Sequence, residues 1–145
     1  MSKTKQLKPA LYDGKSLETY DRWVDMPGGF AVPHPELWGK AGLYRATLNG
    51  EIMFIGKGAG MHTGLLERLY DLRRPGDSGR RYRAGQYINA HLDELGLQVA
   101  VMGSDGAARA LTSKLLWPMI RRHRPRLNVD PTFLSNIIQT AYEAR

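Results

Sequence analysis

"AGLYRATLNGEIMFIGKG", residues 41–58, is the stretch that decides how this chain folds. Its side chains alternate in character on either side of Asn49-Gly50, a dipeptide that strongly favours a type I′ turn between antiparallel strands. A β-hairpin is therefore predicted here, with its second strand beginning at Glu51. Two features are not explained by a hairpin alone: Tyr44 near its start, and Gly-Lys-Gly at residues 56–58.

The segments after the hairpin predict helices and one further strand. Leucines at helical spacing predict a helix over 64–74 with Thr63 as its N-cap, and a second helix is expected over 86–95. "LQVAVMG", residues 97–103, predicts a strand, and 107–123 predicts a long helix. We therefore expect an α+β fold in which helices flank a small, mostly antiparallel three-stranded sheet.

The ends of the chain differ from this central region. Residues 1–40 are rich in turn-forming residues, with a short helix expected from Ser16 to Val24, and are predicted to form an irregular arm packed on the core. Residues 41–130 are the predicted core. Asp130-Pro131 predicts the start of a last amphipathic helix over 131–145, within the same domain.

Composition limits the possible functions. The chain has 145 residues, enough for one domain with a hydrophobic core, and no cysteine, which excludes disulfides, thiolate zinc sites and thiol catalysis. It has no apolar run of about 18 residues, so we expect no membrane-spanning helix. The first residues lack the apolar core of a signal peptide, which predicts a cytoplasmic protein.

Charge points to an anionic partner. Lys and Arg number 21 against 14 Asp and Glu, a net charge of +7, and many arginines fall in two blocks. Arginine binds phosphate through a planar pair of hydrogen bonds, so the blocks favour nucleic acid over a merely solvated basic surface. The candidate nucleic-acid-binding residues are Arg73, Arg74, Arg80, Arg81, Arg83, Arg121, Arg122 and Arg124.

The hairpin and the segments after it resemble the GIY-YIG nuclease family. "GLY" at 42–44 is similar to the first half of the name motif and "FIG" at 54–56 to the second. Arg68 and then "RPRLN" at 124–128 follow in the family's order. The resemblance covers about residues 41–129. It implies a GIY-YIG-like fold, Mg²⁺-dependent hydrolysis of double-stranded DNA, and a homodimer or homotetramer with the last helix as a candidate interface.

The resemblance also implies a role for each matching residue. Arg68 would stabilise the negative charge of the transition state, and Tyr44, with Lys57 beside it, would orient or deprotonate the attacking water. Gly56 would let the backbone approach the phosphate, and Asn128 would support the site through hydrogen bonds. The plainer alternatives are that Arg68 is a surface arginine, Tyr44 a strand aromatic in the core, Gly56 a strand end and Asn128 a loop cap.

Two departures from the family pattern weaken the expectation of catalysis. Phe54 stands where the family has its second tyrosine, so the ring remains and the hydroxyl is lost. No acidic residue lies between Gly106 and Val129, where the family has its metal-binding glutamate. A helical wheel places Lys114 inside the apolar face of the 107–123 helix, at the expected ligand position, although a lysine reaching solvent from the helix edge is the alternative.

An ammonium cannot bind Mg²⁺, so an impaired nuclease that does not hold the ion is predicted. It would be either an inactivated form whose parent has Glu at position 114, which the remaining site residues favour, or a natural protein that exchanged cleavage for binding. The alternatives are a non-catalytic nucleic-acid-binding protein on the same scaffold, and an RNA- or ribosome-associated basic protein.

Overall fold

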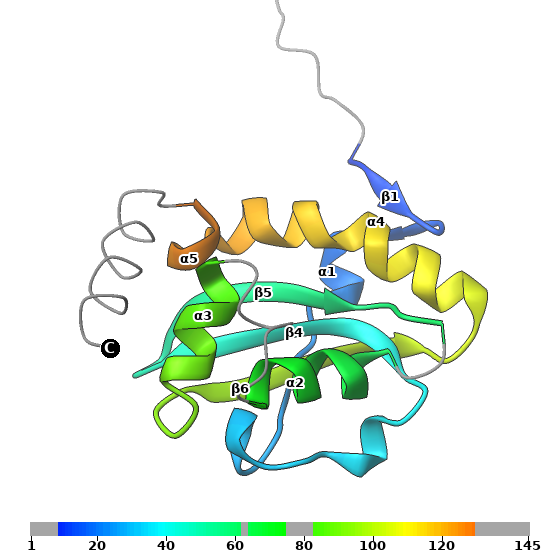
Figure 1. The fold of residues 1–145 in the computed structure, drawn as a ribbon. Helices are drawn as coiled ribbons and strands as arrows, with labels where there is room; N and C mark the ends of the chain where they lie inside the picture. Colours follow the sequence, from blue (N-terminus) through cyan, green and yellow to red (C-terminus); the bar gives the residue numbers. More distant parts are fainter. Residues whose placement is uncertain (1–8, 62–63, 75–82, 130–145) are drawn as a thin grey trace, which may run out of the picture.

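The predicted hairpin is confirmed. The structure is a computed structural model and describes residues 9–61, 64–74 and 83–129 (Figure 1). Strands β4 (Ala41–Leu48) and β5 (Glu51–Gly58) pair antiparallel, with Tyr44 opposite Gly56. Asn49 and Gly50 both have positive φ, 51° and 83°, as a type I′ turn requires. Thr63 and the expected last helix over 131–145 lie outside the described residues.

The main sheet has four strands, so the α+β class is confirmed and the predicted count of three is wrong. β6 (Gly96–Gly103) pairs antiparallel with β4, and β3 (Val24–Asp25) pairs with the other edge of β6, giving the order β3-β6-β4-β5. β3 has two residues, too few to show an alternating pattern within a turn-rich segment. Its pairing is reinforced by Gln98, whose Nε2 donates to the Asp25 carboxylate over 2.7 Å.

The remaining short elements belong to the N-terminal arm. β1 (Leu11–Tyr12) and β2 (Lys15–Ser16) form a separate two-stranded ribbon, followed by α1 (Leu17–Tyr20). α1 ends at Tyr20, short of the predicted Val24. Two 3₁₀ turns, η1 (Gly29–Ala31) and η2 (Pro35–Leu37), complete the arm, which contributes the buried side chains of Phe30 and Leu37 to the core.

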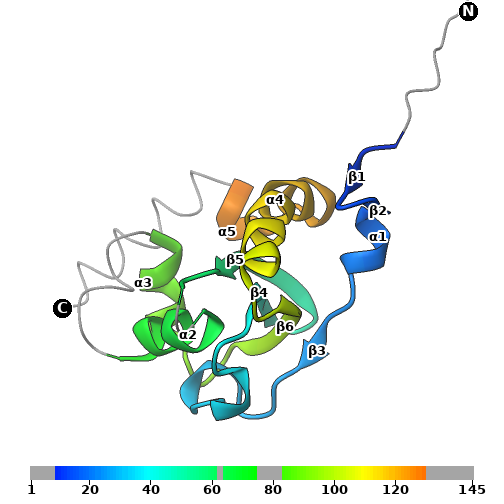
Figure 2. The same ribbon diagram turned by 90° about the vertical axis from the view of Figure 1, so that its right-hand side faces the viewer.

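Helices cover both faces of the sheet (Figures 1 and 2). α4 (Gly106–His123) packs on one face, where Leu111, Leu115 and Met119 meet the buried side chains of β4, β5 and β6. α2 (Leu65–Arg73) and α3 (Arg83–Ala90) pack on the other, and α5 (Arg126–Val129) contacts β5. In the described part of the chain, no helix is long and apolar enough to cross a membrane.

Asp21 joins the arm to the end of α4. Its carboxylate accepts hydrogen bonds from Trp23 Nε1 at 2.6 Å and from His123 Nε2 at 2.8 Å, and it lies 3.0 Å from Arg122 Nε. The Arg45 guanidinium lies 4.4 Å from the centre of the Trp23 ring, which extends the cluster to β4. Asp21 and Trp23 of the arm thus connect it to α4 and to β4.

Acidification is expected to weaken this junction. Burial alone would raise the pKa of Asp21, but the hydrogen bonds from Trp23 and His123 and the Arg122 charge outweigh it, so the pKa lies below its ordinary value. A carboxyl group of this kind stabilises the fold above its unfolded pKa and loses that contribution as pH falls through the folded pKa. Asp21→Asn should lower the free energy of unfolding by about 1–3 kcal/mol at pH 7.

The measurement is urea unfolding at pH 7 and at about pH 3, near the ordinary range of aspartate. The difference between the wild type and Asp21→Asn should shrink at the lower pH. Asp13→Asn is the matched control, because Asp13 forms an exposed pair with Lys114 and should contribute less than about 1 kcal/mol. Equal losses for the two variants at both pH values would contradict the role of Asp21.

Candidate functional site

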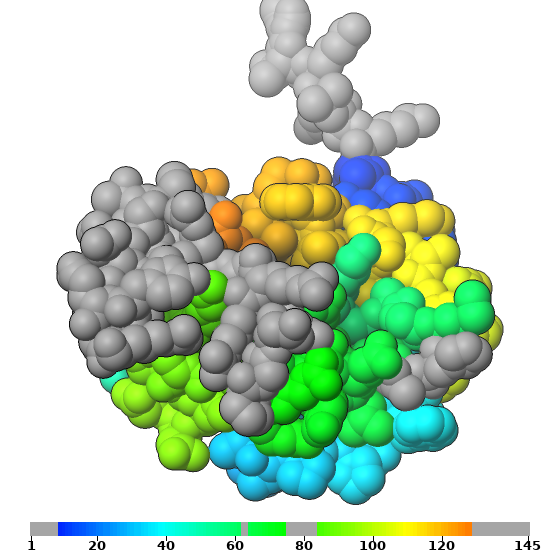
Figure 3. Space-filling model, viewed as in Figure 1, coloured from blue at the N-terminus to red at the C-terminus, as the bar shows by residue number. Residues whose placement is uncertain are grey.

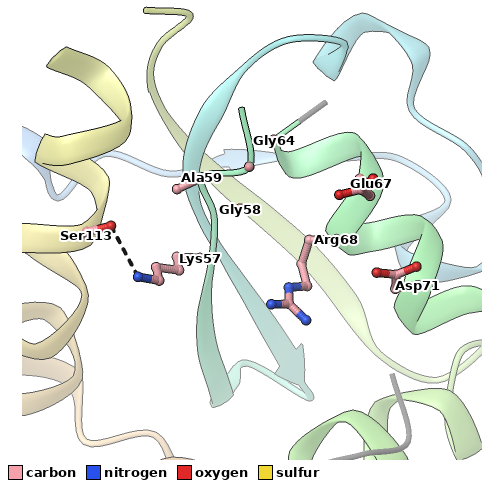
Figure 4. A pocket seen from close by; sticks show the side chains of 9 residues that line it. Lys57, Gly58, Ala59, Gly64, Glu67, Arg68, Asp71 and Ser113 are labelled. Atoms are coloured by element: carbon pink, nitrogen blue, oxygen red, sulfur yellow. Dashed lines mark hydrogen bonds between the residues drawn. The ribbon is translucent and has the colours of Figure 1, made fainter. Parts of the chain in front are cut away.

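A pocket opens between α2 and α4 where the chain leaves β5 (Figure 4). Its volume is about 300 Å³, and it is lined by Lys57 and the glycine-rich segment after it, by Arg68 of α2 and by Ser113 of α4. An adjoining hollow of about 250 Å³ shares Lys57 and Arg68 and runs along β5 past Tyr44 to Asn128. We call the two together the β5 cleft. In the space-filling view, the end of β5 reaches the surface between α2 and α4 (Figure 3).

Two cations approach the β5 cleft from different elements. Lys57 projects from β5 toward α4 and donates from Nζ to Ser113 Oγ over 3.2 Å. Arg68 projects from α2 on the other side of β5 and lines the same pocket (Figure 4). Leu65, Leu69 and Leu72 form the buried stripe of α2, and half-buried Arg68 lies at its rim. The β5 cleft is therefore lined by an ammonium group from β5 and a guanidinium group from α2.

Tyr44 is both a core residue and a cleft residue. Only 1% of its surface is exposed, and its ring centre lies 6.2 Å from that of Phe30 and 6.0 Å from that of half-buried Phe54. Phe54 thus packs beside Tyr44. The ring crosses over Gly56, where an added Cβ would meet the hydroxyl and lie 2.5 Å from Cζ. Gly56 therefore makes room for the ring that carries the phenol to the cleft.

Asn128 completes the outer edge of β5. Its Oδ1 accepts from the backbone N–H of Ile55 at 2.9 Å, and its Nδ2 donates to the Ile55 carbonyl at 3.1 Å. A side-chain amide thus pairs with both backbone groups of one residue, as a neighbouring strand would. β5 is an edge strand of the sheet, and this pairing attaches it to α5 at the end of the cleft that Asn128 lines.

The predicted placement of Lys114 is wrong. Its side chain is 58% exposed, its Nζ lies 3.1 Å from the Asp13 carboxylate, and it does not line the β5 cleft. The wheel misplaced the apolar face of the helix, because Ala107 and Ala110, which lie on the same side of the wheel as Lys114, are both exposed. Thr112 is buried instead, and the helix tolerates this because the Thr112 hydroxyl donates to the Ala108 carbonyl.

Because Thr112 is buried in place of the two alanines, α4 turns other side chains to the β5 cleft. Leu116, Trp117 and Ile120 line the hollow beside Tyr44, and Ser113 lines the adjoining pocket. Trp117 and Ser113 were not predicted as site residues, although an aromatic side chain on the polar side of an amphipathic helix is a signal that the sequence contains.

The side chains in the cleft do not fit a magnesium ion held from α4. Mg²⁺ requires oxygen ligands, and the hollow beside Tyr44 has no carboxylate among its described lining residues. Glu67 and Asp71 line the adjoining pocket from α2, and Asp71 lies 3.2 Å from Arg74. Across the ranges that the structure describes, no three His, Asp or Glu side chains gather as a metal site.

The predicted basic blocks are only partly described. α2 and α4 end on the same side of the molecule, where α3 and α5 lie (Figure 1). Arg73 and Arg74 each lie 5.4 Å from the centre of the Tyr70 ring, and Arg122 pairs with Asp21 and Glu18. The side chains of Arg121 and Arg124 are exposed. Arg80, Arg81 and the side chain of Arg83 lie outside what the structure describes.

Comparisons of the chain with protein-family models, with curated proteins and with solved structures find no match.

Proposed function

We propose that this chain binds double-stranded DNA through the β5 cleft, on a GIY-YIG-type scaffold without metal-dependent cleavage. The observation that carries the proposal is that Lys57 of β5 and Arg68 of α2 line the same cleft, which Tyr44 also lines. A backbone phosphate between the two cations would accept charge-assisted hydrogen bonds from both. The net charge of +7 would attract the polyanion, although part of the arginine surface is paired with acids.

The missing carboxylate of α4 favours binding over hydrolysis. The family's reaction, implied by the resemblance, uses a metal ion to neutralise charge that develops on the phosphate. Leu116 lies on α4 where a ligand could face Tyr44 and Arg68, and its side chain has no oxygen. The expected inactivating role of Lys114 no longer applies, because Lys114 lies outside the cleft.

The second candidate function is the endonuclease itself. It is favoured because Tyr44, Lys57, Arg68 and Asn128, which the resemblance singled out, line one cleft. Cutting both strands needs two active sites, so this candidate would be a homodimer or homotetramer.

Two measurements test the proposal and separate it from the second candidate. In fluorescence anisotropy, the wild type should bind a labelled duplex with an affinity that falls steeply as salt rises, because phosphate contacts release counterions. Incubated with supercoiled plasmid and Mg²⁺, it should leave the plasmid intact. Absence of duplex binding would disprove the proposal. Nicking that Arg68→Ala abolishes would establish the endonuclease instead.

A matched pair of substitutions tests the family scaffold. Leu116→Glu places a carboxylate at the cleft, and Lys114→Glu places one on the exposed side of α4. If the scaffold is of the GIY-YIG type, Leu116→Glu should gain Mg²⁺-dependent plasmid nicking and Lys114→Glu should not. Nicking by neither variant would count against the resemblance while leaving DNA binding intact.

A further inference from the structure

Trp117 presents an exposed indole at the rim of the β5 cleft. Of its surface, 62% is exposed, and it lines the same hollow as Tyr44, Lys57 and Arg68. The buried stripe of α4 runs through Leu111, Leu115 and Met119, so Trp117 projects from another side of the helix. A large flat apolar surface thus stands beside two cations.

Other surface aromatics of the described residues are placed differently. Two arginines lie by the Tyr70 ring, and Arg45 lies over Trp23. Trp38 is 63% exposed, nearly the same as Trp117, but it does not line the β5 cleft. Among the described residues, no ring or guanidinium stacks on the Trp117 indole.

Nucleic acids offer a flat partner directly beside a phosphate. Proteins that hold unpaired strands combine cations along the backbone with aromatic side chains on which bases stack. In an intact duplex, neighbouring base pairs already cover both faces of each base, so an indole can stack only on a base that has left the stack. Trp117 beside Lys57 and Arg68 has both components of such a site.

We infer that the preferred ligand of the β5 cleft is duplex DNA with an unpaired nucleotide, whose base stacks on Trp117 while its phosphate lies between Lys57 and Arg68. This inference rests on the proposed function, because it takes the phosphate site for granted. The inference adds a substrate class to the proposed function: DNA at a lesion, a mismatch, a flap or a frayed end.

The test compares two labelled duplexes of equal length and charge. One is fully paired, and in the other a single base faces an abasic site and so has no pairing partner. The full-length wild type should bind the second about tenfold more tightly, within the range that base stacking on an aromatic side chain contributes. Trp117→Ala should bind both equally, and Trp117→Phe should keep most of the preference.

Trp38→Ala is the matched control, because it removes an indole of the same exposure away from the cleft; it should keep the full preference. Equal wild-type binding to the two duplexes, or a preference that survives Trp117→Ala, would overturn the inference while duplex binding still supports the proposed function. Failure of the wild type to bind either duplex would overturn both. Circular dichroism of each variant verifies that it is folded.

Discussion

Gly56→Ala is expected to lower the free energy of unfolding by about 3 kcal/mol, the upper part of the range for overpacking a core. The added Cβ would lie 2.5 Å from Cζ and 2.7 Å from Cε1 of the Tyr44 ring. That ring is 1% exposed and lies between Phe30 and Phe54, so it cannot swing aside as the end of a flexible side chain would. Urea unfolding monitored by circular dichroism measures the effect.

Gly60→Ala is the matched control for this prediction. It adds the same methyl group four residues later, where the nearest atom is Glu67 Oε1 at 3.6 Å, an ordinary contact distance. It should change stability by less than about 0.5 kcal/mol, as surface substitutions usually do. A Gly56→Ala variant as stable as Gly60→Ala would contradict the packing of Tyr44 over Gly56.

A double variant connects the clash to Tyr44 itself. Tyr44→Ala alone should be strongly destabilising, by about 3–5 kcal/mol, because it empties a buried aromatic site. Adding Gly56→Ala to it should cost little more, since the ring that the methyl group meets is gone. Additive losses would show that Gly56 is required for another reason.

Removing the two cations of the β5 cleft is expected to have the largest effect on DNA binding. Arg68→Ala should weaken duplex binding by about 10- to 100-fold, the loss expected for a charge-assisted hydrogen-bonded contact. Lys57→Ala should weaken it less, because an ammonium is a compact point charge without the guanidinium fork. Each substitution should also lower the slope of log affinity against log salt by about one.

Lys114→Ala is the control for general charge. It removes one positive charge from the exposed side of α4, where Lys114 pairs with Asp13, and it should change duplex affinity less than about twofold. Anisotropy titrations at three salt concentrations measure all three variants. An equal loss for Lys114→Ala would mean that the surface binds DNA through diffuse charge and that the cleft has no special role.

The sequence by itself determined the elements whose signals are local. Asn49-Gly50 predicts its turn because only a few residues tolerate two consecutive positive φ angles, and the leucine spacing of α2 places Arg68 at the rim of a buried stripe. The helix expected over 86–95 begins and ends earlier in the structure, where α3 runs from Arg83 to Ala90. Helix boundaries are less strongly encoded than helices themselves.

Only the tertiary structure decided which residues meet at the cleft. Two residues of β3 become a strand because β6 offers them a partner, and Asn128 meets Ile55 across 73 positions of the chain. Which face of α4 turns to the cleft depends on whether Ala107 and Ala110 or Thr112 are buried. The apolar pattern cannot decide this, because alanine is small enough to be exposed and the Thr112 hydroxyl is satisfied within its own helix. Periodicity encodes the type of each element, whereas the rotation of one element against another follows from packing that no local pattern contains.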